Sequence, residues 1–185
     1  MAEVVSAAGV GMPDLDASFR PRFPWWGGDL QTLRNRLLCV STDLSPWPWE
    51  TLHFPMKDGS GDCLLASLHR GNAPGRPPVV LIHGMTGCED SSYIRASARF
   101  HLERGHPVLR VNLRGAGPSN RICREHYNAG SSHDLLSLLA QLCRREERLM
   151  SQGCYVMGFS LGGSILLRSL AEDAGDLPMR AAVAA

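Results

Sequence analysis

Ser160 is the residue of this sequence best placed to do chemistry. It lies in the stretch YVMGFSLGGSIL, residues 155–166, between Gly158 and Gly162, with Gly163 directly after. An apolar run precedes this turn and another follows it, which predicts a strand, a tight turn and a helix. In that context the pattern G-x-S-x-G holds a serine hydroxyl clear of the sheet as a nucleophile. The alternative interpretation is a small residue at the N-terminus of a helix.

A second glycine-rich turn, HGMTG, follows an earlier apolar strand and runs from His83 through Gly84 to Gly87. In an α/β sheet both turns fall at the carboxyl ends of strands, so we expect them to lie side by side. The backbone amides of Met85 and Leu161 could then form an oxyanion hole, because acyl transfer places a negative charge on the substrate oxygen.

His83 is expected to order its loop rather than to act as the general base, because it precedes the turn. Neither turn has the pattern of a phosphate-binding loop, G-x-x-x-x-G-K-[ST] or G-x-G-x-x-G. The chemistry that the two turns favour together is therefore attack by Ser160 on an acyl group.

The elements around the turns predict an α/β fold with a mainly parallel sheet. Residues 49–70 show partial alternation on both sides of KDGSGD, which indicates an antiparallel ribbon that includes His53 and His69 as strand residues. Apolar strands are then expected at VVLIHG, HPVLRVNLRGAG, CYVMGF and MRAAVAA. Helices are expected between them, over 91–104, over 133–149 with Ser131 or Ser132 as cap, and after Ser160. Residues 1–22 are expected to be a flexible lead-in, and residues 23–185 to belong to one domain.

Five motifs in order carry a resemblance to a known family: FPWWGGDLQTL, KDGSGD, LIHGMTGCEDSSYIR, VNLRGAGPSN and VMGFSLGGSILL. From residue 23 onward the chain resembles the YheT-like branch of the α/β-hydrolases. The resemblance implies a serine esterase or lipase of short-chain acyl esters or acylglycerols, without a cofactor or metal. It implies Ser160 as nucleophile and Met85 and Leu161 as oxyanion donors. Some members transfer the acyl group to an alcohol, and Asp29 stands here where the family usually has histidine.

In one respect the sequence departs from the pattern of this family. In this fold the catalytic triad runs in the order Ser, Asp or Glu, His, and no histidine follows Ser160. Asp173 and Asp176 come too soon after Ser160 to be the triad acid. We therefore expect the N-terminal portion of a hydrolase domain, with a sheet incomplete at its C-terminus and without appreciable turnover. A noncatalytic fragment or binding protein of the same fold is the alternative.

Composition narrows the classes of partner. Lys and Arg total 19 against 18 Asp and Glu, so no basic excess points to nucleic acid or to an anionic membrane surface. No apolar run approaches the roughly 18 residues that a membrane span needs, and the N-terminus lacks the pattern of a signal peptide. The six cysteines form no C-x-x-C, which argues against a zinc or dithiol site and favours buried free thiols. We expect a cytoplasmic protein that acts on a small acyl ester.

Overall fold

In a computed structural model, the chain is described at residues 23–24, 26–27, 30, 42–173 and 179–185. The predicted lead-in over residues 1–22 and the residues Asp29 and Asp176 lie outside the described part. By its internal contacts the chain divides into two units, Met1–Val40 and Ser41–Ala185. All helices and strands named below belong to the second unit.

A six-stranded mixed sheet organises this unit, in the order β1-β2-β4-β3-β5-β6. The strands β1 (Trp49–Pro55) and β2 (Cys63–His69) form an antiparallel hairpin, and β2 also pairs antiparallel with β4 (Val108–Val111). The strands β4, β3 (Val79–Ile82), β5 (Cys154–Gly158) and β6 (Met179–Ala184) are parallel to one another. The prediction of an N-terminal antiparallel ribbon on a mainly parallel sheet is confirmed.

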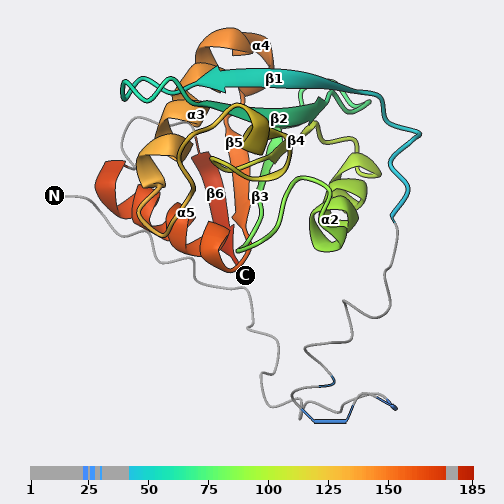
Figure 1. The fold of residues 1–185 in the computed structure, drawn as a ribbon. Helices are drawn as coiled ribbons and strands as arrows, with labels where there is room; N and C mark the ends of the chain where they lie inside the picture. Colours follow the sequence, from blue (N-terminus) through green and yellow to red (C-terminus); the bar gives the residue numbers. More distant parts are fainter. Residues whose placement is uncertain (1–22, 25, 28–29, 31–41, 174–178) are drawn as a thin grey trace, which may run out of the picture. The chain divides into compact units, whose positions relative to one another are not determined.

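Helices cover both faces of the sheet (Figure 1). On one face lies α2 (Ser92–Leu102), and on the other lie α3 (Ser132–Arg145) and α5 (Leu161–Asp173). A short 3-10 helix, η1 (Gly117–Arg121), lies against β2, and a single turn, α4 (Glu147–Met150), packs beside α3. Since helices cover both faces, β3 and β4 are buried at every residue, and apart from Arg110 all these residues are apolar.

Two hydrophobic cores result, one under each helical layer. Leu135, Leu138 and Leu142 of α3 meet Ile165 and Leu166 of α5 over one face of the sheet. On the other face Ile94, Ala98 and Leu102 of α2 pack on Leu81 and Val108. These α2 residues recur at intervals of four, the spacing that gives a helix one apolar stripe. Each fully buried leucine or isoleucine contributes about 1.5–3 kcal/mol relative to an exposed one.

Three local predictions need correction. The helix expected over 133–149 is broken at Glu146, whose φ of −121° and ψ of 50° are not helical, so that α3 and α4 are separate. Ser131 stands at the N-cap of α3, but its hydroxyl accepts a hydrogen bond from the amide of Asn128, at 3.0 Å, and caps no helical amide. Of the five described cysteines, all free, only Cys154 is buried; the others are partly exposed.

A buried arginine ties the β1–β2 hairpin to α3 and to the loop after β4. Arg114, just beyond β4, donates to the carboxylate of Asp134 on α3 at 2.5 and 2.9 Å. The same guanidinium contacts Asp62 at 3.1 Å, Asp58 at 2.7 Å and Glu125 at 3.2 Å. The Arg114 side chain is only 5% exposed. These charge-assisted bonds fix the loop after β4, which carries residues 114–131, onto the hairpin and α3.

Candidate active site

The turn between β5 and α5 holds Ser160 in an unusual backbone conformation. Its φ is +50°, in the left-handed region, which few residues other than glycine adopt. The side chain is exposed, two residues after the end of β5 and one before the start of α5. A serine at a strained strand-to-helix turn is the geometry in which a G-x-S-x-G serine presents its hydroxyl. The Ser160 amide donates to the carbonyl of Ala185, at 2.7 Å, which ties the turn to the end of β6.

The glycines around Ser160 are required by close backbone contacts. A Cβ on Gly158 would collide with the backbone of Gly162 and Gly163. A Cβ on Gly162 would lie 2.5 Å from the carbonyl oxygen of His83 and 2.8 Å from that of Ile82. Both flanking glycines therefore let α5 start directly against the ends of β5 and β3.

The HGMTG turn lies against the serine turn. A Cβ on Gly84 would come within 3.1 Å of the Cβ of Ser160, and the Phe159 amide donates to the carbonyl of Ile82 at 3.0 Å. Residues 84–87 form a turn closed by a hydrogen bond from the Gly87 amide to the Gly84 carbonyl, at 3.2 Å. Its third residue, Thr86, has a φ of +58°, the sign that a type II turn requires at this position.

Two backbone amides remain available beside Ser160. Neither the amide of Met85 nor that of Leu161 has a hydrogen-bond acceptor among the residues that the structure describes. Leu161 is the first residue of α5, so its N–H belongs to the positive end of the helix dipole. Met85 is 67% exposed, at the outer side of its turn. Free amides on two adjoining turns are the donors that an oxyanion needs.

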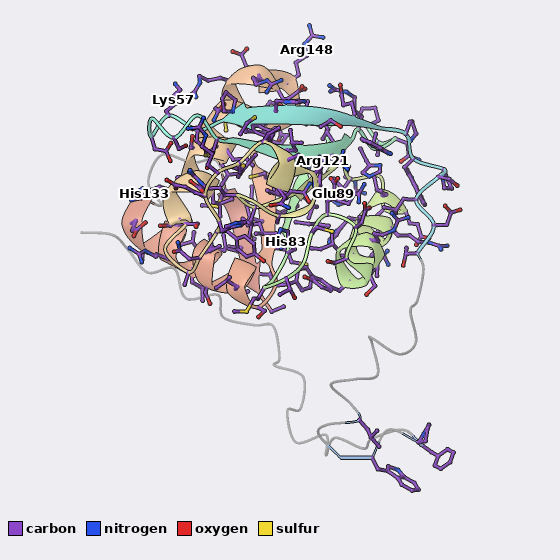
Figure 2. All side chains as sticks on the ribbon, in the orientation of Figure 1. Lys57, His83, Glu89, Arg121, His133 and Arg148 are labelled. Atoms are coloured by element: carbon purple, nitrogen blue, oxygen red, sulfur yellow. The ribbon has the colours of Figure 1, made fainter. Side chains whose placement is uncertain are left out.

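His83 is enclosed beneath this site (Figure 2). Its Nδ1 lies 2.7 Å from the Gly84 carbonyl, and its Nε2 accepts the Leu113 amide at 3.1 Å. An N–H donor at Nε2 and a carbonyl at Nδ1 together assign the neutral ring with the proton on Nδ1. Burial lowers the pKa of His83, which favours the same neutral form. With both nitrogens engaged, this imidazole has no lone pair free to accept a proton from Ser160.

His53, His69 and Asp173 belong to regular elements of the fold. His53 and His69 are strand residues, as predicted, and the Nε2 of His69 accepts from Arg110 at 3.2 Å. Asp173 is the last residue of α5. Within the described part of the chain, no group of three His, Cys, Asp or Glu side chains could hold a metal ion. None of the helices described is long and apolar enough to cross a membrane.

Two tyrosines that the sequence patterns do not single out contact the site. The hydroxyl of Tyr93 accepts the Gly84 amide at 2.9 Å, and the hydroxyl of Tyr127 accepts the Thr86 amide at 2.8 Å. Tyr93 was visible in the motif LIHGMTGCEDSSYIR, but only as part of the following helix. Tyr127 lies 41 residues after Thr86 and belongs to a loop, so no local pattern points to its contact.

Comparison with known proteins agrees with this architecture. A family model described as the alpha/beta hydrolase fold matches residues 77–185. The chain is 31% identical over 168 residues to YheT of Escherichia coli strain K12, covering 90% of this chain and 47% of that protein. It is 28% identical to the monoacylglycerol lipase of Saccharomyces cerevisiae, covering 58% of this chain and 24% of that protein.

The chain thus spans about half or less of the length of these relatives. Among solved structures, the Pyrococcus furiosus esterase Pf2001 superposes with a TM-score of 0.60 at 21% identity, over 70% of this chain and 48% of that one. The α/β hydrolase GrgF from Penicillium superposes with a TM-score of 0.60 at 20% identity, over 74% and 45%. At these identities the superpositions establish the fold, and with the family match they confirm the resemblance found in the sequence. The chain belongs to the family of the α/β-hydrolase fold.

Proposed function

We propose that Ser160 is the nucleophile, and that the amides of Met85 and Leu161 form the oxyanion hole, of a serine carboxylic-ester hydrolase. The observation that supports this most strongly is Ser160 itself, exposed at φ +50° on the strand-to-helix turn, with the HGMTG turn against it. A solvent-facing serine in this conformation has no structural need that glycine would not meet at lower cost.

The proposed reaction is attack of the Ser160 hydroxyl on an ester carbonyl. The serine proton passes to a base, and the carbonyl oxygen becomes an oxyanion held by the amides of Met85 and Leu161. When the bond to the alcohol oxygen breaks, the base gives that proton to the departing alcohol. Water then attacks the acyl-enzyme, the acid is released, and the proton of the water passes through the base to Ser160. An alcohol in place of water would make the same intermediate serve acyl transfer.

The substrate class follows from the relatives. Their names include a monoacylglycerol lipase and a phospholipase. We therefore propose a small or lipid-like acyl ester as the substrate of this site.

Turnover needs an imidazole or another base, and none of the seven histidines follows Ser160. His83 lies near the serine turn, but both of its ring nitrogens are occupied. We expect the 185-residue chain alone to hydrolyse esters very slowly, since an unactivated serine hydroxyl is a weak nucleophile. The engagement of both ring nitrogens of His83, the histidine nearest the serine turn, is what favours the second candidate, a noncatalytic protein of the hydrolase fold.

The two candidates differ in the reactivity of Ser160 when a base is supplied in solution. The experiment treats the chain with an alkyl fluorophosphonate at rising imidazole concentrations and locates the adduct by peptide mass mapping. We expect single labelling at Ser160 with a rate that increases with imidazole, and no labelling of Ser160→Ala. Ser164→Ala is the matched control, because Ser164 is an exposed serine one helical turn further along α5. Absence of labelling at every imidazole concentration would reject the hydrolase and favour the noncatalytic protein.

A further inference from the structure

The HGMTG turn is held by a pair of tyrosine hydroxyls, which accept the amides on either side of Met85. Tyr93 accepts the amide of Gly84, at 2.9 Å, and Tyr127 accepts the amide of Thr86, at 2.8 Å. The amide between them, that of Met85, has no acceptor in the described part of the chain. Three successive N–H groups are thus divided into two that are anchored and one that is free.

We propose that Tyr93 and Tyr127 are positioning residues, which orient the Met85 amide toward the oxyanion that forms at Ser160. This inference rests on the proposed function. It says that two side chains outside the catalytic triad set the orientation of one of the two oxyanion-hole donors. Neither hydroxyl has to touch the substrate, since each acts through the peptide group next to Met85.

Tyr93 connects the HGMTG turn to the nucleophile turn. It comes from the first turn of α2, and its ring packs on Phe159, the residue before Ser160, with ring centroids 5.1 Å apart. Gly87 makes room for it, because a Cβ at Gly87 would lie 2.5 Å from the Tyr93 hydroxyl. One side chain therefore fixes the Gly84 peptide and contacts the residue that precedes the nucleophile.

Tyr127 reaches the turn from the loop that Arg114 anchors. Its own amide donates to the carbonyl of Arg114 at 3.0 Å, and its ring meets that of His83 edge to face, with centroids 5.4 Å apart. Its hydroxyl holds Thr86, a β-branched residue at a φ of +58°. That conformation is unfavourable for such a side chain, so it persists only where surrounding contacts impose it.

Orientation matters because an oxyanion hole acts through donors that are already aimed before charge develops. If a tyrosine hydroxyl is removed, the amide that it held must find water, and the peptide groups beside Met85 can rotate. The Met85 N–H then points at the forming oxyanion for only part of the time. The loss falls on the step in which charge develops on oxygen, with little effect on the exposure of the Ser160 hydroxyl.

The test compares two probes that differ only at the atom held by the oxyanion hole, a fluorophosphonate with P=O and its thio analogue with P=S. In both reactions the Ser160 oxygen forms a bond to phosphorus, fluoride leaves, and imidazole in solution takes the serine proton. Backbone N–H groups form shorter and stronger hydrogen bonds to a negatively charged oxygen than to the larger sulfur. A well-oriented oxyanion hole therefore raises the ratio of the labelling rate with the P=O probe to that with the P=S probe, which is the oxygen-to-sulfur rate ratio. The variants are Tyr127→Phe and Tyr93→Phe, which keep the aromatic ring.

Tyr155→Phe is the matched control, because Tyr155 lies on β5 with its ring against His106, away from the HGMTG turn. We expect Tyr127→Phe and Tyr93→Phe each to lower the oxygen-to-sulfur rate ratio by about tenfold, while Tyr155→Phe leaves it unchanged. Amide hydrogen exchange supplies a second readout, in which Thr86 exchanges faster in Tyr127→Phe and Gly84 in Tyr93→Phe.

The outcomes separate this inference from the proposed function. If the unaltered chain is not labelled at Ser160 in imidazole, the proposed function fails and the inference fails with it. If it is labelled and both tyrosine variants keep its rate ratio, only the inference is overturned. Equal loss of both rates with an unchanged ratio would also overturn it, since general disturbance of the fold slows both probes alike.

Discussion

The carbonyl oxygen of His83 lies so close to Gly162 that a methyl group on that glycine would come within 2.5 Å of it. This contact joins the two turns of the site, because His83 begins one and Gly162 belongs to the other. The two nearest atoms that a new side chain would meet are backbone oxygens at and just after the end of β3, which cannot rotate away as a side chain could.

Gly162→Ala should therefore destabilise the protein by about 1–3 kcal/mol, the usual cost of overpacking a tight contact. The same change should slow labelling of Ser160 in imidazole, because the start of α5 must move away from the HGMTG turn. Ser164→Ala, on the exposed side of the same helix, should have little effect on either property. The free energy of unfolding is measured by urea denaturation, provided that the variants have the same m-value. A Gly162→Ala protein as stable as the control would show that the two turns are not in this contact.

The backbone strain at Ser160 gives a second prediction. At φ +50° an L side chain is unfavourable, while glycine is not. Ser160→Gly should thus be more stable than Ser160→Ala by about 1 kcal/mol. In the regular interior of α5 the order must reverse, because glycine costs about 1 kcal/mol relative to alanine in a helix.

The comparison pair is Ser164→Gly and Ser164→Ala, since Ser164 is an exposed residue of that helix. The test is the sign of the difference in unfolding free energy between the glycine and the alanine variant at each position. Glycine should be the better residue at position 160 and the worse one at position 164. The same order at both positions would mean that Ser160 is not strained.

The sequence predicted those parts of the site that depend on local pattern. Glycines beside Ser160 and within HGMTG indicated tight turns, and apolar runs before each indicated strands of a parallel sheet, so the meeting of the two turns could be expected. The break at Glu146 could not, because the residues around it favour helix and only the tertiary structure ends α3 there. The predicted cap at Ser131 failed for a related reason, since its hydroxyl binds the amide of Asn128 in the preceding loop instead.

The sequence could not predict most contacts between residues that are far apart along the chain. The partner of the Nε2 of His83 is the amide of Leu113, and that of the Thr86 amide is the hydroxyl of Tyr127. Both depend on the placement of β4 beside β3 and on the loop that follows β4. Neither an apolar period nor a turn motif carries that information.

Arg114 provides the third prediction, on stability. Its guanidinium is the common partner of four carboxylates, of which Asp62 and Asp134 are the most enclosed. Hydrogen bonds from Ser60, followed by the guanidinium of Arg114, lower the pKa of Asp58, so this carboxylate stays charged. Arg114→Met leaves these charges together without a counterion, and we expect a loss of roughly 3 kcal/mol.

Arg121→Met serves as the control for this change, because Arg121 is exposed on η1 (Figure 2). Thermal or urea unfolding at neutral pH measures both variants. The Arg114→Met protein should also recover part of its loss in mild acid, where the orphaned carboxylates take up protons. A protein with Arg114→Met as stable as the Arg121→Met control would show that the network contributes nothing to the fold.

The protonation of His83 gives the last prediction, and it bears on whether this residue could serve as the base. Burial lowers its pKa in the folded protein, while in the unfolded chain it titrates near about 6.5. The unfolded state therefore binds the proton first as pH falls, so the contribution of His83 to stability is complete above that value and decreases below it. Nitrogen-15 spectra of the imidazole should show a neutral ring protonated at Nδ1 through pH values at which the same residue in urea is charged. A ring that takes up its proton near 6.5 in the folded protein would mean that the bond to the Leu113 amide is weak, and would restore His83 as a candidate base for Ser160.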